Sequence, residues 1–207
     1  MATDETFKTT KKDLQLLFLN LVQYELNITG GITSSEFIAI IAKHEFSAKE
    51  AFIKGFVQKP IEQIEKEIEA IKKKQKASKD KAGDFGNELF IATKYDLDQL
   101  KSILDITDIK LISVSDKLAN EILQCGITLF NHFHETQTEI AEIALELIKK
   151  AQFIALGSVV KDRINESTPI VEKYLKSRPE RERMKKIKDE FEFVSDNLVS
   201  CQFNNVV

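Results

Sequence analysis

The chain has 207 residues, of which 43% are hydrophobic and 30% charged, a balance that favours a globular chain over a disordered one. Its 30 Lys and Arg residues and 33 Asp and Glu residues give a net charge of -3, so no positive excess attracts nucleic acid. With no Trp, three Pro and seven Gly against 14 Phe, the composition favours long helices packed through Phe, Leu and Ile.

The N-terminal part of the chain contains signals for three helices. Each predicted helix start is a Thr or Ser followed three residues later by an acidic residue, a spacing typical of capping boxes. These pairs are Thr10 with Asp13, Thr33 with Glu36, and Ser47 with Glu50. Gly30 and Gly31 are expected to end the first helix, because glycine readily adopts the left-handed conformation that closes many helices.

A row of isoleucines follows Pro60, where the missing backbone donor predicts a kink or a new helix start. The isoleucines recur at helical spacing, which is typical of a seam in a coiled coil or a helix bundle. They are Ile61, Ile64, Ile68 and Ile71. We predict that this isoleucine seam binds a protein partner or a second copy of the chain.

A lysine-rich stretch at 72–88, KKKQKASKDKAGDFGNE, follows the isoleucine seam. It contains two glycines and almost no core residues, so we predict a hinge or mobile loop there within a single helical domain over 1–207. Its lysines fit a solvated helix end, where positive charge suits the helix dipole. Contact with an acidic partner, an anionic lipid surface or nucleic acid is the alternative for this cluster.

The middle of the chain is expected to be helical. Residues 105–117 are rich in β-branched side chains, but the helices predicted around them favour helix here too. Apolar periodicity then continues from Leu118 to Ile164, well beyond the usual length of a globular helix. The sequence therefore predicts either a break near Gly126 or an elongated bundle.

Two further helix starts are predicted near the C-terminus. Thr168 followed by Pro169 is a favourable cap and first residue, and Ser177 is expected to begin the last helix. The apolar residues of that last helix alternate at spacings of four and three: Ile187, Phe191, Val194, Leu198 and Cys201. This rhythm makes the last helix the second candidate surface for binding a partner.

The corner from Glu25 to Glu36, ELNITGGITSSE, resembles the loop of an EF-hand. With Glu25 as its first residue, Gly30 falls at the sixth position and Glu36 at the twelfth, where calcium loops have a glycine and a carboxylate. The resemblance implies one calcium site, although its first ligand is Glu where the family has Asp. The same residues also predict a glycine-ended helix followed by a capped one, so both interpretations stand at this point.

No pattern of catalytic residues is present. The sequence has no glycine-rich phosphate loop, nucleophile elbow or HExxH motif, and Cys125 and Cys201 lack the spacing of a zinc or redox pair. One helical stripe contains an imidazole and several carboxylates, and a solvated face is the expected explanation for it. Its members are His132, Glu135, Glu139, Glu142 and Glu146. We therefore expect a non-enzymatic protein without cofactor or metal.

The chain shows no segment of the kind that directs secretion or spans a membrane. No apolar core of a signal peptide stands near residue 1, and no run of apolar residues is long enough for a membrane helix, so the cytoplasm is the expected compartment. The apolar segment 151–160, AQFIALGSVV, is too short to span a bilayer and is expected in the core. Its contact with lipid is the alternative.

These patterns together predict an all-α protein, an elongated antiparallel bundle of long amphipathic helices. Its expected function is non-enzymatic binding, in which helix faces contact a protein partner or a second copy of the chain. Two alternatives stand beside this expectation. One is a membrane-active, pore-forming-like bundle, and the other is a calcium-binding protein with a single degenerate EF-hand-like loop at Glu25 to Glu36.

Overall fold

The computed structural model describes residues 4–133 and 140–203. Within these ranges the chain forms eight α-helices and one short 3-10 helix and contains no strand, so the all-α prediction is confirmed. In chain order the elements are α1 (Asp4–Thr29), α2 (Ser34–Ala42), α3 (Lys49–Ala77), η1 (Lys79–Lys81), α4 (Ala82–Ile103), α5 (Ile109–Phe133), α6 (Ile140–Ile154), α7 (Ser158–Lys176) and α8 (Arg178–Phe203).

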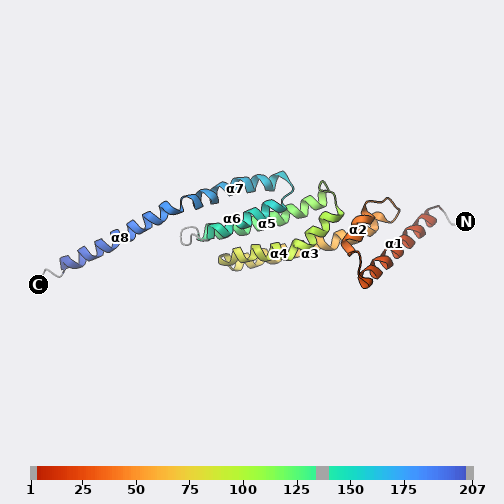
Figure 1. Ribbon diagram of the computed structural model, residues 1–207, viewed down its shortest axis with the longest axis horizontal. Coiled ribbons are helices and arrows are strands. Elements are labelled where there is room, and N and C mark those ends of the chain that lie inside the picture. The colour runs from red at the N-terminus through yellow and green to blue at the C-terminus, as the bar shows by residue number, and fades with distance from the viewer. Residues whose placement is uncertain (1–3, 134–139, 204–207) are drawn as a thin grey trace.

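Helices α3 to α7 form the bundle, in which each helix packs against the one before it (Figure 1). A single hydrophobic core runs along this bundle. Its largest fully buried side chains are Ile64, Ile71, Leu89, Leu100, Leu111, Leu118, Ile122, Leu123, Leu147, Ile148 and Ile154. The molecule is elongated, and α1 and α8 lie at its opposite ends (Figure 1).

A smaller apolar cluster attaches α1 and α2 to one end of the bundle. Leu19 of α1, Ile38 of α2 and Phe52 of α3 are buried together there. The rings of Phe37 and Phe52 meet edge to face with their centroids 6.3 Å apart, a favourable aromatic geometry. Leu19 is the only buried residue among the described side chains of α1, so one face of this helix is anchored and the rest is open.

The corner between α1 and α2 is the glycine-ended one that the sequence predicts. Gly30 has a φ of 64°, the left-handed conformation that favours glycine. The Thr33 hydroxyl accepts a hydrogen bond from the backbone N of Glu36, whose carboxylate accepts one from Thr33 N at 2.8 Å. This predicted capping box is confirmed, whereas the one at Ser47 is wrong, because the N-cap of α3 is Ala48 without a side-chain hydrogen bond.

The structure differs from the loop predicted at 72–88. Helix α3 continues to Ala77, η1 follows, and α4 begins at Ala82, so only Ser78 lies outside a helix. The glycines of this stretch, Gly83 and Gly86, are buried against α5 and α6. They permit close helix packing, and the lysines point outward, where two of them pair with Glu69 and Glu88.

Helix breaks lie at other positions than the sequence indicates. Pro60 and Pro169 are inside α3 and α7, where each was predicted to interrupt or begin a helix. Gly126 is inside α5 and not at a break, and a Cβ added to it would lie 3.1 Å from the carbonyl oxygen of Ala144 in α6. The long apolar run is instead divided between α5, α6 and α7.

Asp116 of α5 fixes the corner between α6 and α7. Its Oδ1 accepts hydrogen bonds from the backbone N of Leu156 at 3.0 Å and of Gly157 at 2.9 Å. A Cβ added to Gly157 would lie 2.1 Å from Asp116 Oδ2, so this approach requires glycine. The carboxylate therefore satisfies backbone donors where α7 begins, as a helix cap does, although it comes from a distant part of the chain.

Replacing Asp116 with Ala is expected to lower the free energy of unfolding by about 1–2 kcal/mol, because two half-buried backbone donors lose their acceptor. Urea denaturation measures this loss. Asp116→Asn keeps an acceptor oxygen in the same place and is expected to recover part of it. Equal losses for the two variants would show that the hydrogen bonds at this corner do not carry the effect.

Cys125 is a buried thiol in α5 that accepts a hydrogen bond from Gln75 Nε2. Burial, its largest influence, raises the pKa of this thiol from its ordinary 9.0 to about 12. Thiols react as thiolates, so a Cys201→Ser variant is expected to consume no aromatic disulfide reagent at pH 8 while folded. The folded-state pKa of Cys125 is higher than the unfolded-state value, so the neutral thiol contributes to the free energy of unfolding. This contribution is complete below pH 9 and is lost as the pH rises toward 12. Immediate labelling of the folded variant would contradict the burial.

Candidate functional site

Helix α8 projects from the bundle and exposes a row of apolar side chains (Figure 1). Its backbone comes close only to that of α7 among the described elements. Met184, Ile187, Phe191 and Val194 are all exposed, and Phe191 is exposed by 77%. These residues follow one another at spacings of three and four, so they form one stripe along the helix, which we call the α8 stripe.

Helix α1 exposes a second apolar face at the other end of the molecule. Its exposed members are Phe7, Leu14, Leu17, Phe18, Leu21 and Tyr24. Phe7, Leu14 and Phe18 line one shallow groove of this surface. Contiguous apolar surface of this kind on a folded protein marks a binding site more often than single exposed residues do. We call this face the α1 face.

The isoleucine seam lies within the chain's own core. Ile64 and Ile71 are exposed by 0% and 1%, and Ile68 is buried beside them against the helices of the bundle. Ile61 is partly buried and packs on the same core. In this conformation the seam that was predicted to bind a partner is covered by the chain's own helices, whereas the α8 stripe and the α1 face are exposed.

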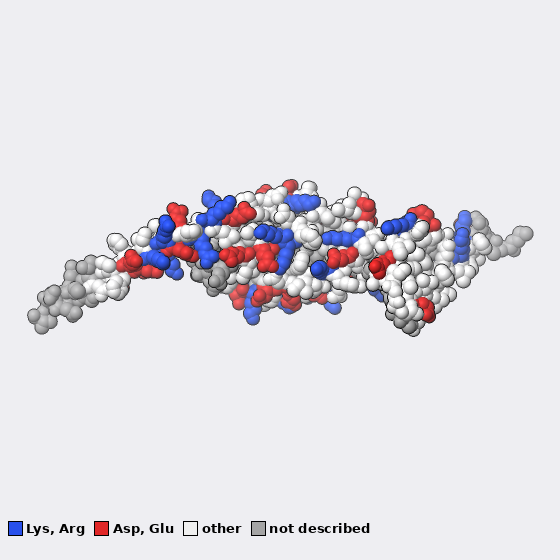
Figure 2. Space-filling model, viewed as in Figure 1, with Lys and Arg blue, Asp and Glu red and all other residues white. Residues whose placement is uncertain are grey.

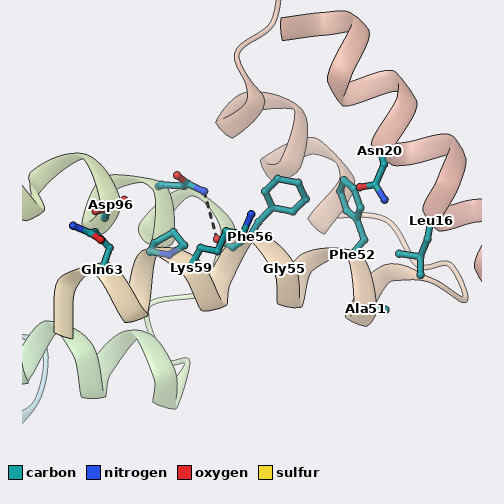
Figure 3. Close-up of a pocket in the computed structure, with 11 residues that line it drawn as sticks. Leu16, Asn20, Ala51, Phe52, Gly55, Phe56, Lys59, Gln63 and Asp96 are labelled. Carbon is teal, nitrogen blue, oxygen red and sulfur yellow. Dashed lines mark hydrogen bonds between the residues drawn. The ribbon is translucent and has the colours of Figure 1, made fainter. Parts of the chain in front are cut away.

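A cleft of about 650 Å³ runs along α3 and is lined by residues of α1 toward one end and of α4 toward the other (Figure 3). Phe52 and Phe56 of α3 are toward one end of it, and the centroids of their rings lie 4.9 Å apart. The other end is polar and contains Lys59, Gln63 and Asp96 (Figure 3). Partial burial, followed by the negative charge of Glu67, raises the pKa of the Asp96 carboxyl.

The cleft combines apolar and polar side chains. Phe52 is buried in the cluster that attaches α1 and α2, so Phe56 is the more accessible aromatic side chain, and Lys59, Gln63 and Asp96 supply the polar groups. One side of the cleft is Leu16 and Asn20 of α1, so it adjoins the α1 face (Figure 3).

A buried carboxylate, Glu121, lies in α5 beside an open groove. Burial is the largest influence on it and raises its pKa, while Lys72 and Arg163 act in the opposite direction. Arg163 donates hydrogen bonds to the side-chain oxygens of Asn120 and Gln124. The hydrogen bonds of Arg163 connect α7 to α5 and support the packing of the bundle.

The structure gives no group of three metal-binding side chains within residues 4–133 and 140–203. In the imidazole and carboxylate stripe, His132 is exposed, Glu142 pairs with Arg178, and Glu146 pairs with Lys150. Glu135 and Glu139 lie outside the described residues. The described members therefore have the surface position that the sequence predicts.

The loop that resembles an EF-hand is used as a helix corner. Residues from Glu25 to Thr29 are the last turn of α1, and the Thr29 hydroxyl donates to the carbonyl of Glu25. The Glu36 carboxylate accepts from both the backbone N and the hydroxyl of Thr33, and these bonds lower its pKa. The carboxylate at the twelfth loop position is thus engaged in the cap.

The apolar segment 151–160 forms the corner between α6 and α7. Ala151, Ile154 and Ala155 are buried in the core, while Phe153 and Val159 are exposed. No helix in the part of the chain that the structure describes is long and apolar enough to cross a membrane.

No family model matches the chain, and no curated protein or solved structure is similar to it. Its function is therefore inferred from the surfaces described above.

Proposed function

We propose that the protein is a non-enzymatic binding protein whose bundle holds two terminal helices, α1 and α8, for contact with protein surfaces. The α8 stripe carries this proposal, because it presents large apolar side chains in a helical row on a helix that lies outside the core. Such a row binds most favourably to another helix, which covers it along its whole length. The cytoplasm is the proposed compartment.

A protein surface suits these helices better than a lipid surface. Helices that lie in a membrane interface usually have a polar face rich in Lys and Arg, which binds anionic lipids. Helix α1 has three lysines and four acidic residues, and α8 has six basic and six acidic residues. Because neither helix has a net positive charge, electrostatic attraction to an anionic bilayer is weak, and a protein partner is the better match.

Site-specific photocrosslinking in the source cells tests this function. The photoreactive residue benzoylphenylalanine replaces Phe18 in one variant and Phe191 in another, and both are expected to form crosslinks to protein. Lys66, exposed on the polar side of α3, is the matched control position and is expected to give few crosslinks. Adducts to lipid alone, or equal protein yields at all three positions, would contradict the proposal.

A further inference from the structure

We propose that a groove between α3 and α5 binds an alkylammonium group, either the side chain of a lysine from another protein or a small aliphatic amine. The groove has a volume of about 350 Å³. Residues within Glu65–Lys72 of α3 and within Lys117–Glu121 of α5 line it. None of them belongs to the α1 face or the α8 stripe, so this inference does not depend on the function proposed above.

The carboxylate of Glu121 is the unusual group in this groove. Glu121 is exposed by only 5%, yet it makes no hydrogen bond or ion pair with any residue that the structure describes. A buried carboxylate normally has a cation or several hydrogen-bond donors beside it, because removing its charge from water is costly. The groove therefore contains a strong acceptor without a donor.

Two lysines of the groove are paired with the two other carboxylates. Lys117 Nζ lies 2.6 Å from a carboxylate oxygen of Glu65, and Lys72 Nζ lies 2.7 Å from one of Glu69. Three carboxylates and two ammonium groups leave one negative charge, which is that of Glu121. One further cation would neutralise the groove, and its most favourable position is beside this carboxylate.

The cation that approaches Glu121 from α7 is also engaged. The Arg163 guanidinium donates its hydrogen bonds to the side chains of Asn120 and Gln124. On the face of the bundle in Figure 2, blue and red side chains lie next to one another, so exposed carboxylates generally have a cation nearby. Glu121 differs from them because it is buried in a groove whose cations are already paired.

The groove suits a cation with a short apolar chain. Ile68 is buried and contributes an apolar wall, along which methylene groups can pack while the ammonium group donates to Glu121. The volume is at the lower end of the range for ligand sites, which favours such a chain over a large ligand. A metal ion is the less suitable cation, because the described residues contain no group of three side chains suited to holding one.

Titration with n-butylammonium chloride tests the groove in the full-length protein. Backbone amide resonances of residues 65–72 and 117–121 are expected to shift and to saturate at millimolar probe in two-dimensional NMR spectra. Neither n-butanol, which has the same chain without the charge, nor sodium chloride is expected to cause these shifts. Glu121→Gln should weaken binding about tenfold or more, because the charged acceptor is lost. The same change at Glu166, exposed on α7, should leave binding unchanged.

Two results would overturn the inference. Equal shifts with n-butanol or with sodium chloride would show that the charge of the probe is not recognised, and this comparison needs no variant. Without any probe, Glu121→Gln is expected to raise the melting temperature, because it removes a buried charge that lacks a partner. An unchanged or lower melting temperature would show that a cation of the chain itself, such as Lys72, pairs with Glu121 in solution.

A second probe distinguishes the two sources of the ammonium group. Nα-acetyl-lysine methylamide presents the lysine side chain as it occurs in a protein. Binding as tight as that of butylammonium supports a lysine of a partner protein, and binding of butylammonium alone supports a free aliphatic amine. Failure of both probes would overturn the inference and leave the proposed function intact, since that function is tested by crosslinks at Phe18 and Phe191.

Discussion

Alanine at Ile64 is expected to lower the free energy of unfolding by about 2–5 kcal/mol, since it leaves a cavity in the centre of the bundle. The Ile64 side chain is completely buried and packs with Ile68 and Ile71 in the core shared by α3 to α7. Urea denaturation followed by circular dichroism measures the loss. Folded Ile64→Ala molecules are expected to keep the assembly state of the wild type, because the Ile64 side chain is not on the surface.

The matched control for Ile64→Ala is Ile91→Ala. Ile91 lies on α4 and is exposed by 73%, so its replacement is expected to change stability by no more than about 0.5 kcal/mol. If Ile64→Ala instead preserved stability and changed the mass of the assembly, the isoleucine seam would bind a partner as the sequence indicated. The core assignment of α3 would then be wrong.

Gly86→Ala is expected to destabilise the chain by about 1–3 kcal/mol, although alanine is normally the better helix residue. The new Cβ would lie 2.8 Å from Leu147 Cδ2 and 2.9 Å from Cys125 Cβ. The Leu147 methyl group can rotate away, but the Cys125 Cβ is fixed by the backbone of α5. Helices α4 and α5 must therefore separate slightly, and the packing around them is weakened.

The same substitution at Gly55 should have the opposite sign. Gly55 is inside α3, and a Cβ added there has no atom within 4 Å, so Gly55→Ala is expected to stabilise the chain by about 0.5–1 kcal/mol. Thermal denaturation of Gly55→Ala and Gly86→Ala measures the two changes in stability. A gain at both positions would mean that α4 is not packed closely on α5 at Gly86, and that residues 72–88 behave as the loop that the sequence predicts.

Apolar periodicity was sufficient to predict the helical class and the seam of α3, but it could not show what covers that seam. The spacing of Ile61, Ile64, Ile68 and Ile71 is the same whether the covering helix belongs to this chain or to another. The answer depends on where the chain turns back, which is at Ser78 and η1 before α4 and at residues 104–108 before α5. Gly83 and Gly86 lie inside α4, where they permit its close packing on α5 and α6. In the sequence those two glycines suggested a loop, because a residue that permits close packing also permits a turn.

Local helix signals were only partly reliable. The predicted start at Thr10 is wrong, because α1 begins at Asp4 and the Thr10 hydroxyl donates to the Thr6 carbonyl, and the exposed Ser47 does not cap α3. Thr33 and Gly30 act on backbone groups within one turn, so their effect was predictable at the exposed α1–α2 corner. Pro60 is buried within α3, where packing of the residues around it outweighs the lost hydrogen bond. Within α7 the Thr168 hydroxyl donates back to the Ile164 carbonyl and does not act as a helix cap.

The sequence predicted one of the two exposed apolar surfaces, the α8 stripe, and missed the other, the α1 face. The rhythm of Ile187, Phe191 and Val194 was visible in the sequence and pointed to α8. The α1 face was missed because its apolar residues look like core residues, and only the position of α1 beyond the bundle leaves them open. The role of Asp116 at the start of α7 was also not predictable from the sequence, because Asp116 is distant in sequence from the corner that it stabilises.

The junction at Ser177 determines where the tip of the molecule can reach. At 1.5 Å per residue, the 26 residues of α8 make an arm about 39 Å long, so a rotation of about 10° at its base moves the tip by about 7 Å. Arg178 meets Glu142 of α6 at 3.1 Å, and the Arg181 guanidinium lies over the ring of Tyr174. These two contacts hold the start of α8 at a defined angle to the bundle. Removing either of them would let the end of α8 sample a larger volume, while the bundle itself stays unchanged.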